Sequence, residues 1–218
     1  PKTRQISITK LSHGLLNTNY QNSKYYGSTS TCPCCYDDIE TLNHVFICQK
    51  QEVEDYQREQ LEILQEALET ISTPNLISSA IFHGLTSWIE VALGLADSYH
   101  CPFSNSVVPS HMVITQAYND QTTIGWDQLL RGRISKLWSV SAQYIRRNNN
   151  LSPDPTWASY LIASLLTYSS SIWIFRCGVL HGHNVAETTQ KHREKLLQEV
   201  NLAYQEFSDN PYIISSSL

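Results

Sequence analysis

The sequence lacks the motifs by which many enzymes are recognised. It has no G-x-S-x-G nucleophile elbow, no glycine-rich loop of the kind that cradles phosphates, and no motif of paired carboxylates. No charged segment followed by an apolar core opens the chain, so no signal peptide is visible, and the first residue is proline rather than methionine. We therefore expect a non-enzymatic protein, and the proline start is compatible with a fragment or a processed product. Four of the six cysteines cluster beside a histidine at metal-ligand spacing, which indicates an intracellular protein, cytoplasmic or nuclear.

An overall excess of basic residues is also missing. The net charge is −5, with −7 over residues 1–124, +4 over residues 125–200 and −2 over the last 18 residues. This distribution excludes a uniformly basic nucleic-acid-binding protein but allows a local basic face in the second half. With 218 residues and 41% hydrophobic residues, the chain is long enough to bury one substantial core.

What the sequence does contain is a cluster of cysteines beside a histidine. Cys32, Cys35, His44 and Cys48 form the pattern C-x2-C-x8-H-x3-C, whose spacing suits one tetrahedral zinc ion. His44 and Cys48 are four residues apart, so they share a face on a helical turn. Four protein ligands leave no position for water, which predicts a structural rather than a catalytic zinc. Two alternatives stay open: Cys34 replaces Cys32 or Cys35 as a ligand, or the thiols are free or redox-paired.

The remaining pattern predicts an all-α protein, a multi-helix bundle with a small N-terminal zinc-binding hairpin or knuckle. Residues 1–50 are expected to form a polar lead-in plus the zinc module, and residues 51–218 a helical domain with a sub-boundary near 97–109. The lead-in is expected to be extended, with a short strand at Gln5–Thr9. Apolar periodicity and capping residues predict helices over 51–71, 74–96 (broken near Gly84), 110–119, 126–147, 155–180 and 186–207.

Residues 156–175 form the one uncharged stretch long enough to span a bilayer. Seven of these 20 residues are serine or threonine, and the large apolar residues recur at helical spacing. This stripe favours the central helix of a soluble bundle over a membrane span, so we expect no membrane partner.

A basic cluster lies on the predicted helix over 126–147. Its members are Arg131, Arg133, Lys136, Arg146 and Arg147, with Trp126 and Trp138 interleaved. Such a surface offers phosphate contacts and stacking platforms to a nucleic acid. The alternative is a solvated helix face whose tryptophans point into the core.

A second metal site would need residues that lie far apart in the sequence. His100, Cys101, Cys177 and His181 are candidates, and a hydrolase using them would hold two metals per chain. Buried cysteines and core histidines explain these residues more simply.

Three segments resemble parts of known proteins. Cys32-Pro33-Cys34-Cys35 and the segment from Glu40 to Cys48 resemble the zinc-binding segment downstream of reverse transcriptase domains in non-LTR retroelement polyproteins. Residues 124–133 and 172–182 resemble, more loosely, the tails of retroelement-derived open reading frames. The resemblance implies zinc bound by Cys32, Cys35, His44 and Cys48, in a piece whose catalytic domain lies elsewhere or is lost.

Two hypotheses of function follow. The first is a non-catalytic, zinc-stabilised accessory domain of a retroelement reverse transcriptase-like protein that assists binding of RNA or DNA. Any polymerase or nuclease activity would then reside in a domain outside this chain, and other domains of the polyprotein would be partners. The second is a zinc-pinned helical domain for protein–protein interaction. The sequence assigns no oligomeric state.

Overall fold

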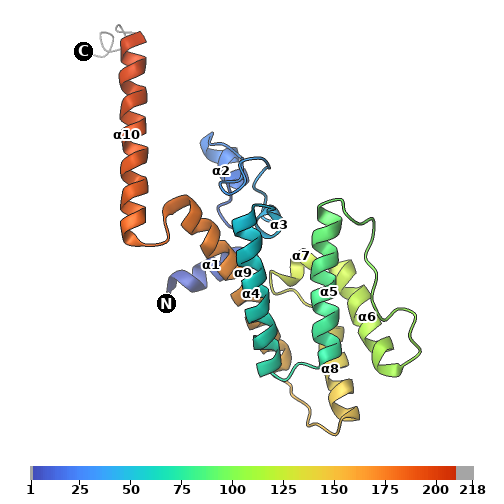
Figure 1. Cartoon of the computed structure of the whole chain (residues 1–218). Helices are drawn as coiled ribbons and strands as arrows, with labels where there is room; N and C mark the ends of the chain where they lie inside the picture. The colour runs from blue at the N-terminus through green and yellow to red at the C-terminus, as the bar shows by residue number, and fades with distance from the viewer. Residues whose placement is uncertain (1, 210–218) are drawn as a thin grey trace. The chain divides into compact units, whose positions relative to one another are not determined.

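The computed structural model describes residues 2–209, and within this range it is all-α with no β-strand (Figure 1). A single isolated bridge joins Thr31 to Ile39. The prediction of an all-α protein with a small cysteine–histidine cluster near its N-terminus is therefore confirmed. The helices are α1 (Lys2–Ser12), α2 (Asn19–Tyr26), α3 (His44–Ile47), α4 (Gln51–Thr70), α5 (Asn75–Ala92), α6 (Pro109–Ile124), α7 (Trp126–Leu129), α8 (Lys136–Asn148), α9 (Trp157–His181) and α10 (Val185–Asp209).

The chain divides into two compact units between Trp173 and Ile174, inside α9. The first unit holds α1 to α8 and most of α9, including the cysteine cluster. The second holds the end of α9 and all of α10, which has no buried residue. The predicted boundaries at residue 50 and near residues 97–109 stay predictions.

The expectation of an extended lead-in is wrong, because residues 2–12 and 19–26 are helical. The segment Gln5–Thr9, expected as a strand, lies inside α1, where the Thr9 hydroxyl donates to the Gln5 carbonyl. Both helices lack apolar periodicity, which is why the pattern failed to show them. Caps define α2 instead: the Thr18 side chain accepts from the backbone of Gln21, and Gly27 ends the helix at φ +63°.

The break expected near Gly84 is also absent, because α5 runs through this residue without interruption. Gly84 is buried against the indole of Trp126, and a Cβ built on it would lie 2.0 Å from the ring. The glycine therefore permits a close approach between α5 and α7 rather than a bend.

The helix predicted over residues 126–147 is two helices, α7 and α8, separated by a turn at residues 130–135. Gly132 takes φ +80° in this turn, a conformation that a continuous helix cannot contain. Because this region forms two helices instead of the one predicted, its basic side chains point in other directions than a single helix would give them.

A fully buried glutamine, Gln121, joins α6 to that turn. Its Nε2 donates to the carbonyls of Gly125 and Arg133, and its Oε1 accepts from the backbone of Ser135 and the indole of Trp138. All the hydrogen-bonding capacity of one buried amide is used, so this side chain fixes the path between α6 and α8.

Helix α9 is the one helix of residues 2–209 with the length and composition to cross a membrane. Its stripe of Trp157, Leu161 and Leu165 is almost completely buried in the first unit, and the Trp157 indole donates to the Thr73 hydroxyl. This stripe packs as the core-helix interpretation expects, but only 33% of the most apolar part of α9 is buried, so the burial does not decide between a core helix and a membrane span. The absence of a membrane partner stays a prediction.

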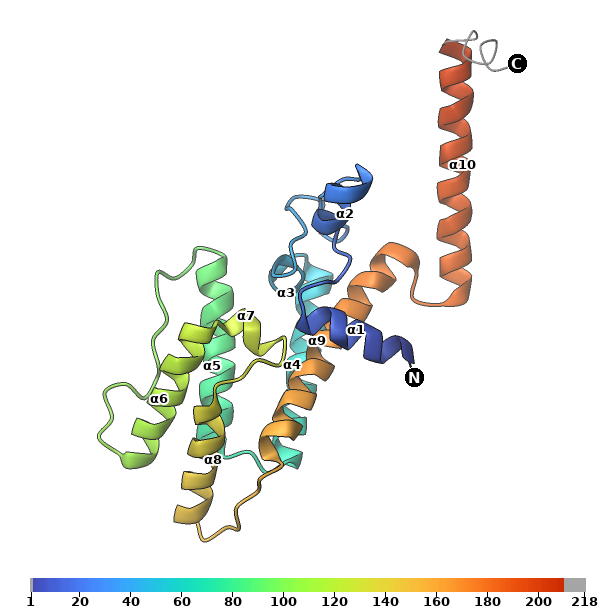
Figure 2. The same cartoon turned by 180° about the vertical axis from the view of Figure 1, so that it is seen from behind.

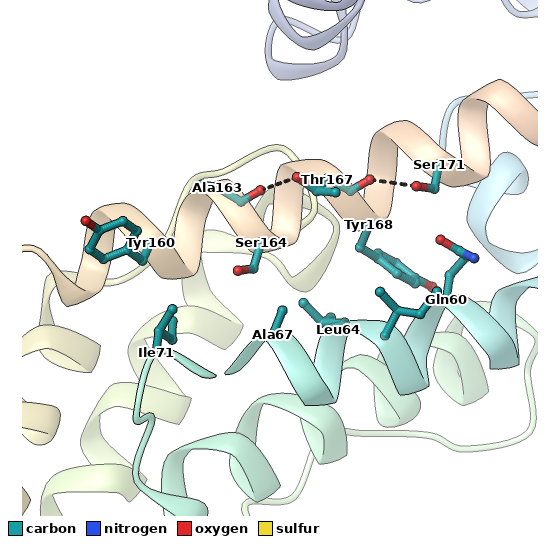
Figure 3. A pocket seen from close by; sticks show the side chains of 11 residues that line it. Gln60, Leu64, Ala67, Ile71, Tyr160, Ala163, Ser164, Thr167, Tyr168 and Ser171 are labelled. Carbon is teal, nitrogen blue, oxygen red and sulfur yellow. Dashed lines mark hydrogen bonds between the residues drawn. The ribbon is translucent and has the colours of Figure 1, made fainter. Parts of the chain in front are cut away.

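Helices α4 and α9 flank a groove of about 250 Å³. Figure 3 shows its α9 side, where the Thr167 hydroxyl donates to the Ala163 carbonyl and the Ser171 hydroxyl to the Thr167 carbonyl. These bonds within the helix satisfy two of the hydroxyl groups that line the groove, which Gln60 and Ser164 also line. Figure 2 shows the same helices from behind.

Candidate metal centre

The metal module, as we call residues 31–48, begins with a tight hairpin. The Cys32 amide donates to the Asp38 carbonyl at 2.8 Å, and the Tyr36 amide donates to the Cys32 carbonyl at 3.0 Å. Tyr36 has φ +62°, which lets the chain reverse between Cys35 and the acidic link formed by Asp37 and Asp38. The turn thus brings the Cys32 and Cys35 thiols to one side, as the hairpin prediction required.

The other two potential ligands come from the short helix α3 and the residue after it. The His44 amide donates to the Thr41 hydroxyl, which starts the helix, and Cys48 follows its last residue. Val45 and Phe46 are buried, so α3 is anchored in the core while His44 and Cys48 face the hairpin.

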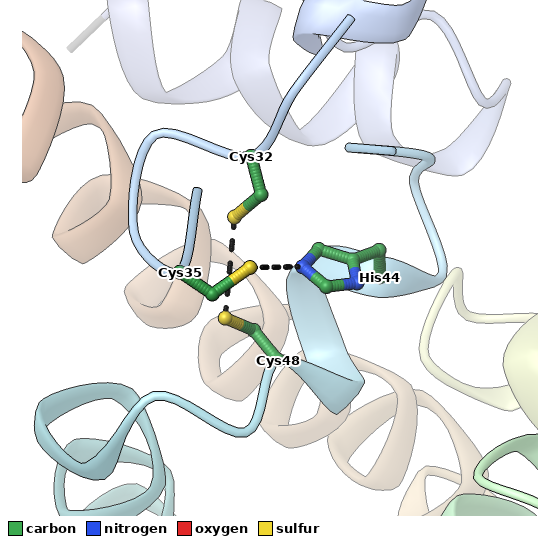
Figure 4. Close-up of side chains that lie close together, drawn as sticks. All are labelled: Cys32, Cys35, His44 and Cys48. Carbon is green, nitrogen blue, oxygen red and sulfur yellow. Dashed lines mark hydrogen bonds between the residues drawn. The ribbon is translucent and has the colours of Figure 1, made fainter. Parts of the chain in front are cut away.

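The donor atoms of Cys32, Cys35, His44 and Cys48 all lie within 4.8 Å of one another (Figure 4). The sulfurs of Cys32 and Cys48 are 3.9 Å apart, and the Cys35 sulfur is 3.5 Å from His44 Nε2. Metal–ligand bonds of about 2.0–2.3 Å in a tetrahedron place ligand atoms about 3.5–3.8 Å apart. These four residues are therefore close enough to hold one metal ion.

Cys34 lies beside this group but outside it. The thiol is buried, and its backbone amide points to the Cys32 sulfur at 3.4 Å. Cys34 was the alternative to either Cys32 or Cys35, and the structure groups Cys32 and Cys35, rather than Cys34, with His44 and Cys48.

In the metal-free cluster, hydrogen bonds shift the pKa values of two thiols in opposite directions. Bonds from Cys34 and Cys48 favour the thiolate of Cys32 and lower its pKa, with a smaller opposing effect of burial. The shared proton with Cys32 raises the pKa of Cys48. The bond to Cys32 likewise raises the pKa of His44, helped by the nearby charges of Cys32, Asp38 and Glu40, while burial opposes the rise. A thiolate is thus already favoured where a metal ion would bind.

Two carboxylates that the sequence did not single out support the ligands. Asp38 Oδ2 lies 3.9 Å from His44 Nδ1, on the side of the ring away from Cys35, which is too far for a hydrogen bond but close enough for its negative charge to help raise the pKa of His44. Glu40 is fully buried, and its carboxylate accepts from the Asn19 amide while the Asn19 side chain donates to the Thr31 carbonyl. These bonds fasten α2 to the metal module.

The predicted nucleic-acid-binding arginines have internal partners. Arg131 pairs with Asp127 at 3.1 Å and donates to Asn43 Oδ1 at 3.2 Å, which ties the α7 region to the metal module. Arg133 donates to Gln128 Oε1 and to the carbonyl of Ser12.

Arg146 also has internal acceptors, since it donates to the carbonyls of Ser72 and Ser152. Lys136 and Arg147 are exposed, and neither has a bonding partner among the described residues. The interleaved Trp126 and Trp138 are buried, so they offer no surface for stacking.

The residues considered for a second metal site fall in both compact units, His100 and Cys101 in the first and Cys177 and His181 in the second, so this alternative stays a prediction. Within residues 2–209 the cluster of the metal module is the only group of three or more potential ligands close enough to share an ion. His100 contacts Ser98, and the Cys101 thiol contacts Thr115.

Over residues 2–209 the fold and the cluster define an all-α protein with a Cys3His group near its N-terminus that is close enough to hold a metal ion. Comparison of the chain with models of protein families, with curated proteins and with solved structures found no match.

Proposed function

We propose that this chain is a non-catalytic, zinc-stabilised accessory domain of a retroelement reverse transcriptase-like protein, and that it assists binding of RNA or DNA. The observation that carries the proposal is the closed set of four protein donors in the metal module, in a segment that resembles the retroelement zinc-binding region. Three sulfurs and one imidazole nitrogen at these distances suit zinc.

Zinc in this centre would act as a structural crosslink. Cys32 and Cys35 come from the hairpin, while His44 and Cys48 come from α3 and its end, so one ion would join two local structures. The ligands occupy all four tetrahedral positions and leave none for a reacting water. The module lies against α2 through Glu40 and against the α7 region through Arg131, so the crosslink would stabilise the surrounding helices as well.

Metal content tests the zinc centre directly. Purified wild-type chain is expected to contain one zinc, and Cys35→Ser and His44→Ala are expected to lose most of it. Cys34→Ser is the matched control, because this neighbouring thiol lies outside the ligand group. If Cys35→Ser and His44→Ala retain full zinc, the assignment of ligands is wrong.

Nucleic-acid binding is tested at the two basic side chains of α8 without internal partners. Lys136→Glu and Arg147→Glu should weaken binding to RNA or DNA and reduce its salt dependence, since each lost phosphate contact removes about 0.7–0.9 from the slope of log K against log salt. Lys50→Glu is the control, an exposed lysine outside α8. No binding to either nucleic acid at low salt would refute this part of the proposal.

One observation favours the alternative of a protein–protein interaction domain. Leu196, Val200, Ala203 and Phe207 recur on α10 at spacings of four, three and four, which is the heptad pattern of a coiled coil, and all four are exposed. In a parallel pair with a second copy, Glu199 would face Tyr204 rather than another carboxylate. This alternative predicts a concentration-dependent dimer in sedimentation equilibrium that Val200→Glu abolishes.

A further inference from the structure

Helix α2 exposes aromatic side chains that its folding does not require. Tyr25 is 76% exposed and Tyr26 is 80% exposed, and no residue of the helix is buried. A tyrosine on a helix is normally placed with its ring against the core, because the ring supplies most of its burial energy. These two rings therefore contribute little to the stability of the first unit.

The helix that carries them is nevertheless firmly attached. Thr18 caps its first turn, and the buried Glu40 accepts from the amide of Asn19 while its carbonyl accepts from the amide of Tyr20. Gly27 closes the other end. The two exposed rings are thus presented on an element fixed to the metal module, rather than on a loose segment.

The sequence around α2 contains basic residues and no acidic ones. Residues 1–36 contain four lysines or arginines and no aspartate or glutamate, in a protein whose net charge is −5. Lys24 lies on α2 itself, with its Nζ 4.1 Å from the centroid of the Tyr20 ring. Lys24 therefore places one positive charge on α2, beside its exposed rings.

The geometry of the ring pair indicates the shape of the ligand. The centroids of Tyr25 and Tyr26 are 6.5 Å apart, and the ring planes meet at 63°. Rings at this angle cannot enclose one flat group between them, but each can stack on a separate one. Tyr36 is also 74% exposed, but it adjoins Asp37 and Asp38, so we leave it out of this surface.

We propose that α2 is a stacking platform for single-stranded nucleic acid, in which Tyr25 and Tyr26 each stack on an unpaired base and Lys24 contacts the phosphate backbone. Exposed aromatic rings beside basic side chains, with little charge of the opposite sign, are the features by which proteins bind single strands without sequence preference. Bases in a duplex are already stacked on each other, so a duplex would gain only the backbone contacts. The inference rests on the proposed nucleic-acid-binding function and locates it away from α8.

Fluorescence anisotropy of the full zinc-loaded chain with a labelled 20-nucleotide oligouridylate or oligothymidylate tests the platform. Tyr25→Ala and Tyr26→Ala are each expected to weaken binding by about 5-fold to 150-fold, the loss that removal of one stacked aromatic causes. Tyr25→Phe and Tyr26→Phe should retain most of the affinity, because phenylalanine keeps the ring. Tyr204→Ala is the matched control, a tyrosine 70% exposed on α10. Unchanged zinc content and circular dichroism would show that the variants are folded.

The outcomes separate the platform from the broader proposal. Binding that survives both alanine variants but is lost in Lys136→Glu and Arg147→Glu would overturn the platform and keep the nucleic-acid function at α8. Equal affinity for a duplex of the same length would overturn the stacking argument. A wild-type chain that binds no nucleic acid at low salt refutes both, and α2 would then be left as a surface for a protein partner.

Discussion

Replacing Gly84 by alanine is expected to destabilise the protein, although the same change in an open helical position does the opposite. Alanine is better than glycine in a helix interior by about 1 kcal/mol. At Gly84, however, the new Cβ would lie 2.0 Å, 2.1 Å and 2.4 Å from three carbons of the Trp126 ring. Real Cβ atoms do not approach so closely, so either the ring or α5 must move.

Neither partner can move without cost. Trp126 is 1% exposed, its ring also packs on Tyr118 with centroids 4.9 Å apart, and its indole donates to the Thr122 hydroxyl at 3.1 Å. Overpacking of a core costs about 1–3 kcal/mol, which exceeds the gain in helix propensity. Three contacts of 2.4 Å or less place the cost in the upper half of that range, so we expect Gly84→Ala to lower the free energy of unfolding by about 1–2 kcal/mol.

Urea denaturation followed by far-ultraviolet circular dichroism measures this loss. The exposed Ser79 on the same helix provides the control, since Ser79→Ala should be neutral or slightly stabilising. Trp126→Phe removes the ring atoms that obstruct the new methyl group, so the double variant should be less destabilised than the sum of the two single variants. Strict additivity, or a Gly84→Ala protein as stable as wild type, would refute the packing argument.

Three further predictions concern buried polar groups. Gln121→Leu should lower the free energy of unfolding by about 3–5 kcal/mol in the same assay, because two buried donors and two carbonyls lose their hydrogen bonds to the amide. A decrease below about 1 kcal/mol would show that other groups replace the amide. Arg131→Ala should lower the free energy of unfolding by about 1–3 kcal/mol and loosen the metal module, so that zinc passes to a chelator faster. An unchanged transfer rate would show that the bond to Asn43 does not couple the α7 region to the metal module. Because the pKa of His44 is raised in the metal-free chain, its protonation adds stability below about pH 6.5 and that contribution is lost as the pH rises through the raised value. Protons compete with zinc for the same ligands, so the stability of the zinc-loaded chain should fall on acidification, and parallel pH dependences of the two forms would contradict this reasoning.

The helices that could be predicted from the sequence are those with an apolar stripe or clear end signals. The stripe of α4 and the break at Ser72-Thr73-Pro74 gave its position to within a residue or two, and the same holds for α9 and α10. Helices α1 and α2 were missed because local caps and tertiary bonds hold them, as with the buried Glu40 on Asn19. The proximity of Cys32, Cys35, His44 and Cys48 could be predicted because their spacing within 17 residues is a local property, while their role as zinc ligands stays a prediction.

The arginines show why charge patterning was less informative than the cysteines. Basic residues follow one another at Arg131, Arg133 and Arg146 in the sequence. In the structure, each of these side chains contacts acceptors that lie 4 to 121 residues away in the sequence. The number of charges in a segment does not distinguish a guanidinium that is hydrogen-bonded between two loops from one that is available to bind a phosphate. The turn at Gly132 makes the difference, because it redirects Arg131 and Arg133 toward α1 and the metal module. Lys136 and Arg147 of α8 and Lys24 of α2 are described side chains that have no carboxylate or carbonyl partner. Of these two helices only α2 also exposes aromatic rings, which is why a comparison of the tyrosine variants of α2 with the charge reversals of α8 decides between them.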